Sequence, residues 1–372
     1  MAVVGSVTRP DVEVVLCVNL GSSSVKGAVY EVGAGTERRV AAATVDHAGI
    51  DAVDQTLAQL AAWDDQLTAI GHRVVHGGPH LCEPTRVDAA VLADLHDAIP
   101  FAPLHLPAAL EAIESLSRRR PQLPQVVCFD TGFHRSMPES ARRLAVPRAL
   151  HDAGVRRYGF HGLSYEYVVA TLGAETLGRA VFAHLGNGAS LAAVRDGSSQ
   201  HTTMGLTPTG GIVMGTRSGD LDPGVLVYLA REAGYDPARL EALVDTESGL
   251  LGLSGVSADM RTLLERRADG DPACALAIEV FCTRIRVQVG AYAALLGGLD
   301  TLVFTGGIGA HAAPVRAEAC AGLEHLGVVL DPARNDRHDP IVSGAGGPVT
   351  VRVVETDEDV MVARHTRAVV AA

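Results

Sequence analysis

The sequence predicts an α/β protein built from two similar domains, and three observations lead to this fold class. The chain has 372 residues, about twice the usual size of one domain. Its 47% hydrophobic and 20% charged residues are typical of a compact globular protein, and its 40 glycines indicate many tight turns. Each half begins with apolar strands joined by a turn of small polar residues, NLGSSS and then HLGNGAS. This similarity predicts a duplicated fold with a nucleotide between the halves.

The first half is predicted to begin with strands and to continue with helices. Residues 12–20 and 25–30 read as a hairpin of buried strands around the turn 21–24. Apolar residues at helical spacing predict one helix over 87–99 and a second over 106–116, on either side of the loop PFAPLHLP. The apolar run VVCF predicts a strand that ends at Asp130.

The second half alternates strands with helices. The runs VFAHL, LAAVR, TLVFT and VTVRVVE read as strands, and Asp-Pro pairs at 222–223 and 271–272 read as helix starts. Residues 271–296, closed by two glycines, are predicted to form one long helix. A last helix over 358–370 is placed to return to the first domain. We therefore expect one domain of residues 1–145 plus 358–372 and a second of residues 146–357.

Charge and composition exclude several classes of partner. The net charge is -12 and the longest basic run is Arg118-Arg119-Arg120, so neither nucleic acid nor an anionic membrane is an expected partner. The first ten residues lack the pattern of a secretory leader and no apolar run reaches membrane-spanning length, which favours the cytoplasm. Six cysteines without a CxxC pair are expected to be reduced core thiols: Cys17, Cys82, Cys128, Cys274, Cys282 and Cys320.

Two kinds of segment could bind phosphate. The turn from Asn19 to Ser24, followed by Lys26, offers backbone N–H groups, hydroxyls, an amide and an ammonium. It is not a Walker loop, and an ordinary hairpin turn is an equal alternative. Arg73 in GHRVVHGG and Arg217 in MGTRSGDLDPG could bind carboxylate or phosphate oxygens with two hydrogen bonds each, although a lone arginine is more often a surface ion pair.

Carboxylates follow two of the predicted strands directly. Asp130 comes after VVCF and Glu355 after the last strand. Carboxylates at strand ends that face a phosphate site hold Mg²⁺ directly or through its waters. Elsewhere such a residue is most often a turn former or a helix cap.

Histidines and a glycine-rich segment complete the candidates. His161, His105 and His184 lie in turns or strand ends from which an imidazole can donate to a phosphoryl oxygen, but any one of the 15 histidines is more often structural. His72 and His76 lie in a predicted strand, which argues against a helical zinc site. The segment GIGAHA also fits a weak dinucleotide fingerprint, which lacks the acidic residue expected at the end of the next strand.

Taken together, ten segments resemble the acetate kinase family, in the same order and across nearly the whole chain. They are NLGSSSVK, GHRVVHGG, FAPLH, FDTGFHRSMP, RYGFHG, AHLGNGAS, MGTRSGDLDPG, SGVSADMR, TGGIG and ETDED. That family belongs to the sugar kinase, Hsp70 and actin superfamily. The resemblance therefore implies duplicated actin-like ATPase (ribonuclease H-like) domains with a central cleft, the second domain carrying the nucleotide and the dimer contacts.

The resemblance also implies a role for each matching residue. Residues implied in phosphoryl transfer are Asn19, Arg73, Asp130, His161 and Arg217. Residues implied to hold Mg²⁺, with Mn²⁺ as an alternative, are Asn19, Asp130 and Glu355. Residues implied to bind the carboxylate substrate and enclose its methyl group are Arg73, Val75, Leu104, Phe160 and Pro208. Residues implied to bind ATP are Lys26, His184, Asn187, Gly188, Asp259, Arg261, Gly306, Gly307, Ile308 and Gly309.

The implied activity is reversible transfer of the γ-phosphoryl group of ATP to acetate, giving ADP and acetyl phosphate, by direct in-line attack in a cytoplasmic homodimer. Propionate kinase is the nearest alternative, because one methylene changes binding by only about 1–3 kcal/mol. A non-catalytic ATP-binding protein like Hsp70 or actin is a second alternative.

Three positions depart from the family pattern. His311 stands where the family commonly has Asn, HLPAA where it has HNPAN, and GLSY where it has GTSH. The first departure leaves purine recognition open. Some members of the family use pyrophosphate as the donor, whereas the segments SADMR and GGIG favour a nucleoside triphosphate.

Overall fold

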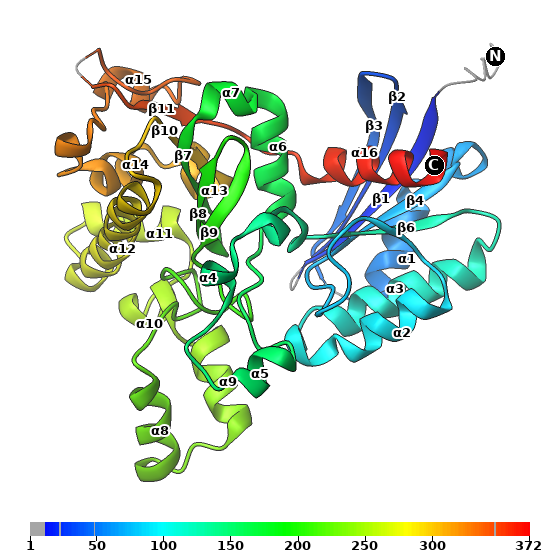
Figure 1. Ribbon diagram of the computed structural model, residues 1–372, viewed down its shortest axis with the longest axis horizontal. Helices are drawn as coiled ribbons and strands as arrows, with labels where there is room; N and C mark the ends of the chain where they lie inside the picture. The colour runs from blue at the N-terminus through cyan, green and yellow to red at the C-terminus, as the bar shows by residue number, and fades with distance from the viewer. Residues whose placement is uncertain (1–11, 22–23, 48, 346) are drawn as a thin grey trace. The chain divides into compact units, whose positions relative to one another are not determined.

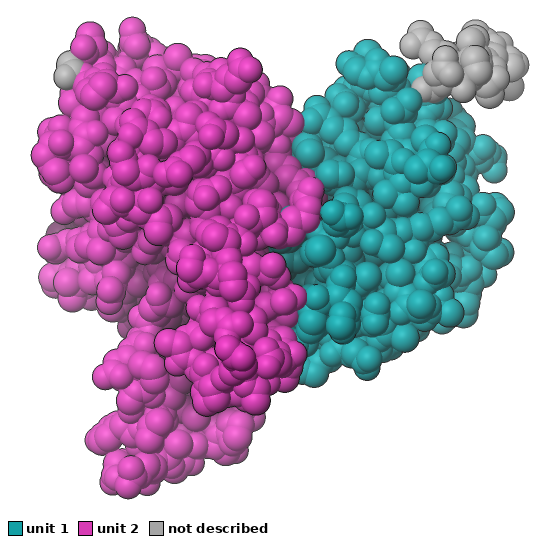
Figure 2. All heavy atoms as spheres, viewed as in Figure 1, with its two compact units in different colours: residues 1–132, 357–372 teal, residues 133–356 magenta. Residues whose placement is uncertain are grey.

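A computed structural model of the chain describes residues 12–21, 24–47, 49–345 and 347–372, and its elements are labelled in Figure 1. The chain divides into two compact units, coloured separately in Figure 2: unit 1 is residues 1–132 with 357–372, and unit 2 is residues 133–356. The sequence placed this boundary after residue 145, whereas the structure places it after Gly132, within the short 3-10 helix η3 (Gly132–Ser136).

Unit 1 contains a six-stranded mixed sheet with the order β3-β2-β1-β4-β6-β5. Strands β1, β2 and β3 are antiparallel neighbours, whereas β1, β4 and β6 run parallel and β5 pairs antiparallel with β6. The carboxyl ends of β1, β4 and β6 therefore share one edge. The strands are β1 (Glu13–Leu20), β2 (Val25–Gly33), β3 (Thr36–Val45), β4 (Ala69–Val74), β5 (Thr85–Arg86) and β6 (Gln125–Phe129).

Helices cover both faces of this sheet (Figure 1). Because side chains alternate along a strand, Leu16 and Val18 of β1 face one side, where they join a core cluster with residues of α1 and α3. Cys17 faces the other side, and its thiol donates to the carbonyl of Asp359 in α16 at 3.3 Å. The helices are α1 (Ile50–Gln59), α2 (Ala89–Asp97), α3 (Leu106–Arg119) and α16 (Glu358–Ala371).

Two glycines let helices approach the sheet closely. A Cβ on Gly27 would lie 2.5 Å from Cγ2 of Thr56 in α1, and one on Gly71 would lie 2.6 Å from Cγ1 of Val362 in α16. Both separations are shorter than van der Waals contact. The absence of a side chain at these positions therefore sets how deeply α1 and α16 sit on the two faces.

Unit 2 repeats the same strand order. Its sheet has the order β11-β10-β7-β8-β9, in which β7, β8 and β9 are antiparallel neighbours and β7, β10 and β11 are parallel. This matches β6-β4-β1-β2-β3 of unit 1, so the predicted duplication is confirmed. The strands are β7 (Arg179–Leu185), β8 (Ala189–Arg195), β9 (Ser198–Thr202), β10 (Thr301–Thr305) and β11 (Thr350–Val353).

The long helix α12 has the limits that the sequence predicted. The carboxylate of Asp271 accepts from the N–H groups of Ala273 and Cys274 at 2.9 and 3.1 Å, and Gly297 ends the helix with a φ of 71°. The helix packs against β7 and β8, while Tyr165 and Val168 of α6 join the core cluster that includes Phe182. The sheet of unit 2 is thus enclosed by helices.

The helices α4 to α15 lie in the described part of unit 2. Their bounds are α4 (Glu139–Arg142), α5 (Arg148–Asp152), α6 (Gly162–Leu172), α7 (Ala174–Leu177), α8 (Pro223–Glu232), α9 (Pro237–Thr246), α10 (Gly249–Ser254), α11 (Met260–Ala268), α12 (Pro272–Leu296), α13 (Gly306–His311), α14 (Ala313–Cys320) and α15 (Pro332–Asp336). None of the helices in the described part of the chain is both long and apolar enough to cross a membrane.

Three local predictions differ from the structure. The helix expected over 87–99 is shorter: Val87 precedes α2 and its N–H donates to Gln125, while Ile99 belongs to a separate 3-10 turn. The strand β3 was not predicted, because half of its residues are exposed and it lacks an apolar alternation. All six cysteines are free and five are buried, but Cys82 is exposed, so the prediction of a core thiol is wrong there.

Candidate functional site

In unit 1, three predicted residues meet at the carboxyl ends of β1, β4 and β6. Asn19 and Arg73 are register partners on β1 and β4, and Asp130 directly follows β6. Arg73 Nη1 donates to Asn19 Oδ1 at 2.9 Å, while its Nε and Nη2 donate to the two oxygens of Asp130 at 3.0 and 2.5 Å. The Asp130 side chain is only 2% exposed. This bidentate pair fixes the plane of the guanidinium group.

Glu358 joins the same cluster, although the sequence analysis did not select it. It lies in the first turn of α16, and its Oε2 is 3.3 Å from Nε of Arg73. Burial alone would lower the pKa of Arg73, but Asp130 and Glu358 outweigh it and hold the pKa above its usual value. Burial and the nearby carboxylates of Asp357 and Glu358 raise the pKa of Asp359 to about 6. Unit 1 therefore presents a fixed cation among several carboxylates.

Glu355 lies outside unit 1, and its role as a metal ligand stays a prediction. It belongs to unit 2, its side chain is 76% exposed, and its Oε1 lies 3.7 Å from His311 Nε2. Lys26 is exposed on β2 opposite Asn19 in the strand register. Ser22 and Ser23 of the predicted phosphate turn lie outside the described residues, as do the first ten residues.

In unit 2, four predicted residues lie in or beside the turn between β7 and β8: His161, His184, Gly188 and Arg217. The rings of His161 and His184 stack with centroids 4.3 Å apart and planes 25° apart. A Cβ on Gly188 would lie 3.3 Å from His161 Nε2 and 3.4 Å from Arg217 Nη1. The imidazole and the guanidinium group therefore flank the same bare stretch of backbone.

Arg217 is held mainly by uncharged groups. Its Nη1 donates to the carbonyl of Pro208 at 3.3 Å, and burial lowers its pKa, which Asp245 partly offsets. The N–H of Gly215 donates to the carbonyl of Asn187 at 2.9 Å, which ties the arginine loop to the β7–β8 turn. Unlike Arg73, this guanidinium group is not paired in bidentate fashion with a carboxylate of the described residues, and an anion placed there would gain a strong partner.

The protonation of His161 follows from its neighbours. Its Nδ1 is 2.9 Å from the hydroxyl of Ser190, which is 2.6 Å from the hydroxyl of Tyr165. Burial raises the pKa of Tyr165, so its phenol keeps its proton. The Tyr165 hydroxyl donates its one proton to the carbonyl oxygen of Ser190 at 3.0 Å, so the Ser190 hydroxyl donates to the oxygen of Tyr165 and accepts from the Nδ1–H of His161. Nε2, the atom next to Gly188, then donates a hydrogen bond when the ring carries a second proton, as an imidazolium.

The residues predicted to enclose the substrate methyl group lie in two different units. Val75 and Leu104 are in unit 1, and Phe160 and Pro208 are in unit 2. Val75 and Phe160 are buried, whereas Leu104 is 53% exposed. Whether they form one apolar niche stays a prediction.

The predicted nucleotide-binding residues occupy the starts of two helices of unit 2. Gly306 to Gly309 form the start of α13, directly after β10. Gly306 has a φ of 75°, and a Cβ there would lie 2.6 Å from the carbonyl oxygen of Leu185, so both the backbone conformation and the space favour glycine. Asp259 is exposed and caps α11 by accepting from the N–H of Arg261 at 3.3 Å. The cap gives Asp259 a local structural role in addition to the predicted one.

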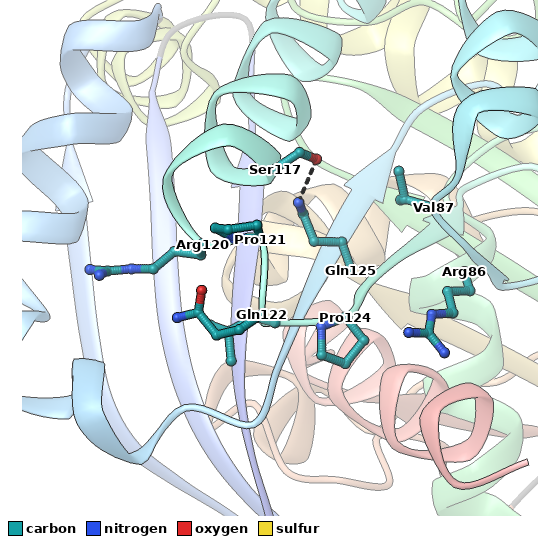
Figure 3. A pocket seen from close by; sticks show the side chains of 9 residues that line it. Arg86, Val87, Ser117, Arg120, Pro121, Gln122, Pro124 and Gln125 are labelled. Atoms are coloured by element: carbon teal, nitrogen blue, oxygen red, sulfur yellow. Dashed lines mark hydrogen bonds between the residues drawn. The ribbon is translucent and has the colours of Figure 1, made fainter.

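A hollow of about 240 Å³ lies at the opposite end of the unit 1 sheet, near the start of β6 (Figure 3). Gln125 at its floor donates to the hydroxyl of Ser117 at 2.7 Å and pairs with His72 Nε2 at 2.6 Å. None of the predicted site residues lines it; its lining residues are Arg86, Val87, Ser117, Arg120, Pro121, Gln122, Leu123, Pro124 and Gln125. The candidate site is therefore at the carboxyl ends of the strands, as in other α/β sheets.

The side chains of unit 1 suit a divalent cation that has few protein ligands and is otherwise bound by water and substrate oxygens. Within the described ranges, no three His, Cys, Asp or Glu side chains form a metal cage. Mg²⁺ in phosphate chemistry is usually held by one or two carboxylates with waters and substrate oxygens. Asp130 and Glu358, together with the Asn19 amide oxygen beside them, supply that kind of donor set.

The duplicated strand order and the polar residues at the carboxyl ends of both sheets define a duplicated actin-like ATPase fold. The profile of the Acetokinase family matches residues 34–364, and the chain belongs to this family. The resemblance inferred from the ten segments is thus confirmed, and so is the fold class.

Related proteins and solved structures agree with this assignment. An acetate kinase of Streptomyces avermitilis is 45% identical, over 96% of this chain and 97% of the relative. An acetate kinase of Syntrophobacter fumaroxidans is 49% identical over 80% of this chain and 74% of the relative. The crystal structure of Porphyromonas gingivalis acetate kinase matches with a TM-score of 0.87 at 36% identity, covering 96% of this chain and 100% of that one. A propionate kinase from Francisella tularensis matches with a TM-score of 0.86 at 34% identity, covering 96% and 99%.

Proposed function

We propose that this protein is an acetate kinase, which transfers the γ-phosphoryl group of ATP to acetate to give ADP and acetyl phosphate, reversibly and in the cytoplasm. The observation that carries the proposal is membership of the Acetokinase family along residues 34–364, with acetate kinases as near-full-length relatives. The reaction class is a phosphotransfer with a carboxyl group as acceptor. The arginines and the imidazole described above are groups that this chemistry requires.

In unit 1 we assign Arg73 to the acetate carboxylate and Asn19 to the γ-phosphoryl group. Asp130 and Glu358, rather than Glu355, are the carboxylates that we assign to the divalent cation, Mg²⁺ with Mn²⁺ as the alternative. The reason is that both hydrogen-bond or pair with Arg73 in the same cluster. When bound, the cation offsets charge on the phosphate oxygens. Asp130 also holds the guanidinium plane, so it orients the group that receives the substrate.

In unit 2 we assign Arg217 and His161 to the oxygens of the phosphoryl group during transfer. A carboxylate oxygen of acetate forms a bond to the γ-phosphorus as the bond to the bridging oxygen breaks, and ADP leaves with that electron pair. No proton is exchanged with the acetate. The guanidinium group and the Nε2–H of a protonated His161, which flank Gly188, stabilise the charge on the equatorial oxygens.

The test is formation of an acyl phosphate, trapped as its hydroxamate by hydroxylamine, from MgATP and acetate. We expect a hydroxamate that depends on acetate, on ATP and on the cation. The absence of product above the enzyme-free control, from a folded protein, would instead favour the alternative of a non-catalytic ATP-binding protein.

Propionate kinase is the second candidate, because the propionate kinase structure from Francisella tularensis is as similar as the acetate kinase structure. Running the same assay with propionate compares kcat/KM for the two acids. A higher value for propionate would assign the protein to the second function. Because one methylene is worth only about 1–3 kcal/mol, we expect activity with both acids.

The phosphoryl donor needs a separate comparison because of His311. We expect ATP to be preferred to pyrophosphate, and the ratio of rates with ATP and GTP to show how His311 affects purine choice. A clear preference for pyrophosphate would overturn the assignment of the donor.

We further propose a homodimer formed through unit 2. In support, Leu276 and Val287 on α12 are 52% and 61% exposed and lie eleven residues apart, about three helical turns, so they share one face. Sedimentation velocity should give twice the chain mass for the wild type and a smaller species for Val287→Glu. A wild type that sediments as a monomer at micromolar concentration would contradict the dimer.

A further inference from the structure

A buried histidine that has no role in the proposed function lies beneath the turn that carries His161. His134, in η3, is 1% exposed. Its Nε2 is 3.0 Å from the carbonyl oxygen of Phe160, and its Nδ1 is 2.8 Å from the hydroxyl of Ser199 in β9. Both ring nitrogens therefore have partners inside unit 2.

The directions of these two hydrogen bonds are determined by the partners. A carbonyl oxygen only accepts, so Nε2 of His134 carries the proton and donates to Phe160. In a neutral ring Nδ1 then accepts from the Ser199 hydroxyl. Burial lowers the pKa of His134 to about 4, which keeps the ring neutral at physiological pH.

The hydrogen bond from His134 acts on a strained part of the backbone. His161 has a φ of 59° and a ψ of 25°, the left-handed conformation, which few residues other than glycine, asparagine and aspartate adopt. Such a conformation persists only where the surroundings enforce it. The carbonyl that His134 holds belongs to the peptide that joins Phe160 to His161, so its direction sets the φ rotation of His161.

The same turn is fitted tightly against His134. Gly159 also has a positive φ, 79°, and a Cβ there would lie 2.6 Å from Cδ2 of His134. On its other side, the N–H of Tyr158 donates to the carbonyl of Gly205 at 3.0 Å. The peptide between Phe160 and His161 thus has a fixed support, and the imidazole of His161 is carried by it toward Gly188.

We infer that His134 is a positioning residue for phosphoryl transfer: its Nε2–H, bonded to the carbonyl of Phe160, holds His161 in the left-handed conformation that directs its Nε2 to the transferring group. His134 touches neither substrate nor cofactor in this role. The inference rests on the proposed function and adds to it the residue that determines the orientation of the His161 ring.

The first test compares two substitutions of similar size that differ in one donor. His134→Gln keeps an N–H near the position of Nε2, whereas His134→Leu removes it. We expect kcat to fall roughly 10- to 100-fold in the leucine variant, with the KM for acetate changed by less than about threefold, because a misplaced group costs rate rather than ground-state binding. The glutamine variant should recover most of the lost rate.

A double-mutant cycle separates positioning from general damage. In a His161→Ala background, adding His134→Leu should lower kcat no further, because the group that it positions is already absent. A structural defect would multiply the two losses instead. His201→Leu is the control for loss of a histidine elsewhere in unit 2: His201 is partly buried and its Nδ1 is 3.0 Å from the hydroxyl of Tyr292, and its loss should leave kcat within about twofold.

A spectroscopic measurement makes the inference independent of turnover. In protein labelled with ¹⁵N-histidine, the ring signals of His161, assigned from a His161→Gln variant, should shift in His134→Leu and keep their wild-type values in His134→Gln and His201→Leu. Unchanged His161 signals in a folded leucine variant, or equal kcat for the leucine variant and the wild type, would overturn the positioning role. A wild type that makes no acyl phosphate would overturn the proposed function instead, and the ring signals would still decide whether His134 orients His161.

Discussion

The two units have the same strand order but carry different chemistry at the same edge of the sheet. In unit 1 the neighbouring parallel strands β1 and β4 bring Asn19 and Arg73 into register, and the two side chains are hydrogen-bonded. In unit 2 the corresponding strands β7 and β10 bring His184 and Thr305 into register. The duplicated topology thus supplies equivalent positions, and the residues there place fixed charges in one unit and imidazoles and bare glycine backbone in the other.

The arginines of the two units differ in the same way. Arg73 is bidentate to Asp130 and also pairs with Glu358. Arg217 donates to a carbonyl, and burial lowers its pKa. Arg73 is therefore part of the folded structure of unit 1, whereas Arg217 is held ready for an anion, and the two should respond differently to mutation.

The largest effect is expected from removing each arginine in turn. Arg217→Leu should lower kcat about 1000-fold with little change in stability, because a contact to the transferring group is lost. Arg73→Leu should lower activity as strongly and also destabilise the fold by about 3 kcal/mol, because the buried carboxylate of Asp130 loses its bidentate guanidinium partner. Hydroxamate kinetics and urea unfolding measure the two effects.

Arg239→Leu is the control for both arginine variants. It removes an exposed pair with Glu247 whose side chains are 42% and 46% exposed, so stability should change by less than about 1 kcal/mol. Near-normal turnover in a folded Arg217→Leu protein would contradict the role of Arg217, and an unchanged stability in Arg73→Leu would contradict the contrast between the units.

A smaller effect on kcat should distinguish Glu355 from Glu358, which lie on either side of the boundary between unit 2 and unit 1 in the sequence. Glu358→Gln should lower kcat about 100-fold and raise the Mg²⁺ concentration needed for half-maximal rate, because it removes a carboxylate from the Arg73 cluster. Glu355→Gln, at an exposed position beside His311, should remain within about threefold of the wild type. The reverse order of the two variants would restore Glu355 as the cation ligand.

The close packing of α16 on the sheet of unit 1 depends on a single glycine of β4. Gly71→Ala should destabilise the protein by about 2 kcal/mol, because the new Cβ would overlap Val362. Gly290→Ala in α12 of unit 2 meets no described atom within 4 Å and should stabilise its helix by about 0.5–1 kcal/mol. Urea unfolding of both variants checks the opposite signs, and a loss of stability in both would contradict the packing.

In each unit, a fully buried histidine with a lowered pKa should make stability depend on pH. Burial lowers the pKa of His72 in unit 1 and of His134 in unit 2 to about 4, from about 6.5 in the unfolded chain. The unfolded state then binds more protons between these values, so stability is complete above pH 6.5 and falls as the pH drops toward 4.

Between pH 7 and pH 5 each of these histidines should cost about 2 kcal/mol of stability. Urea unfolding at the two pH values should show the loss in the wild type, and His72→Gln should reduce it by the contribution of one histidine. The same pH dependence in His72→Gln and the wild type would show that His72 does not titrate as its burial implies.

The sequence was sufficient for the elements whose ends carry a local signal. Asp271, Pro272 and Gly297 mark the limits of α12, and the structure uses the first as a cap and the last as a left-handed stop. The strand β3 has no such signal, because its exposed face and edge position leave it without an apolar alternation. Its place comes from pairing with β2, which only the tertiary structure provides.

The candidate site was predicted where a residue type is unusual for its position and missed where it is ordinary. Asp130 and Glu355 both follow strands and looked equivalent in the sequence. In the structure Asp130 is bonded to Arg73 inside unit 1, whereas Glu355 belongs to unit 2 and lies beside His311. Glu358 was not selected because an acidic residue in the first turn of a helix is common, since it complements the helix dipole. The signal that could have found it is the run ETDED itself, which offers several carboxylates at the start of α16.

The position of α16 has a consequence for the order in which the chain can fold during synthesis. The thiol of Cys17 bonds to the carbonyl of Asp359, 342 residues later, so a face of the first sheet stays bare while the whole of unit 2 is being made. Since domains generally fold as they leave the ribosome, unit 1 is begun first and completed last. A nascent chain stalled before α16 would therefore expose the apolar residues of β1 and β4. Chaperones would have to bind this face to prevent aggregation of the chain.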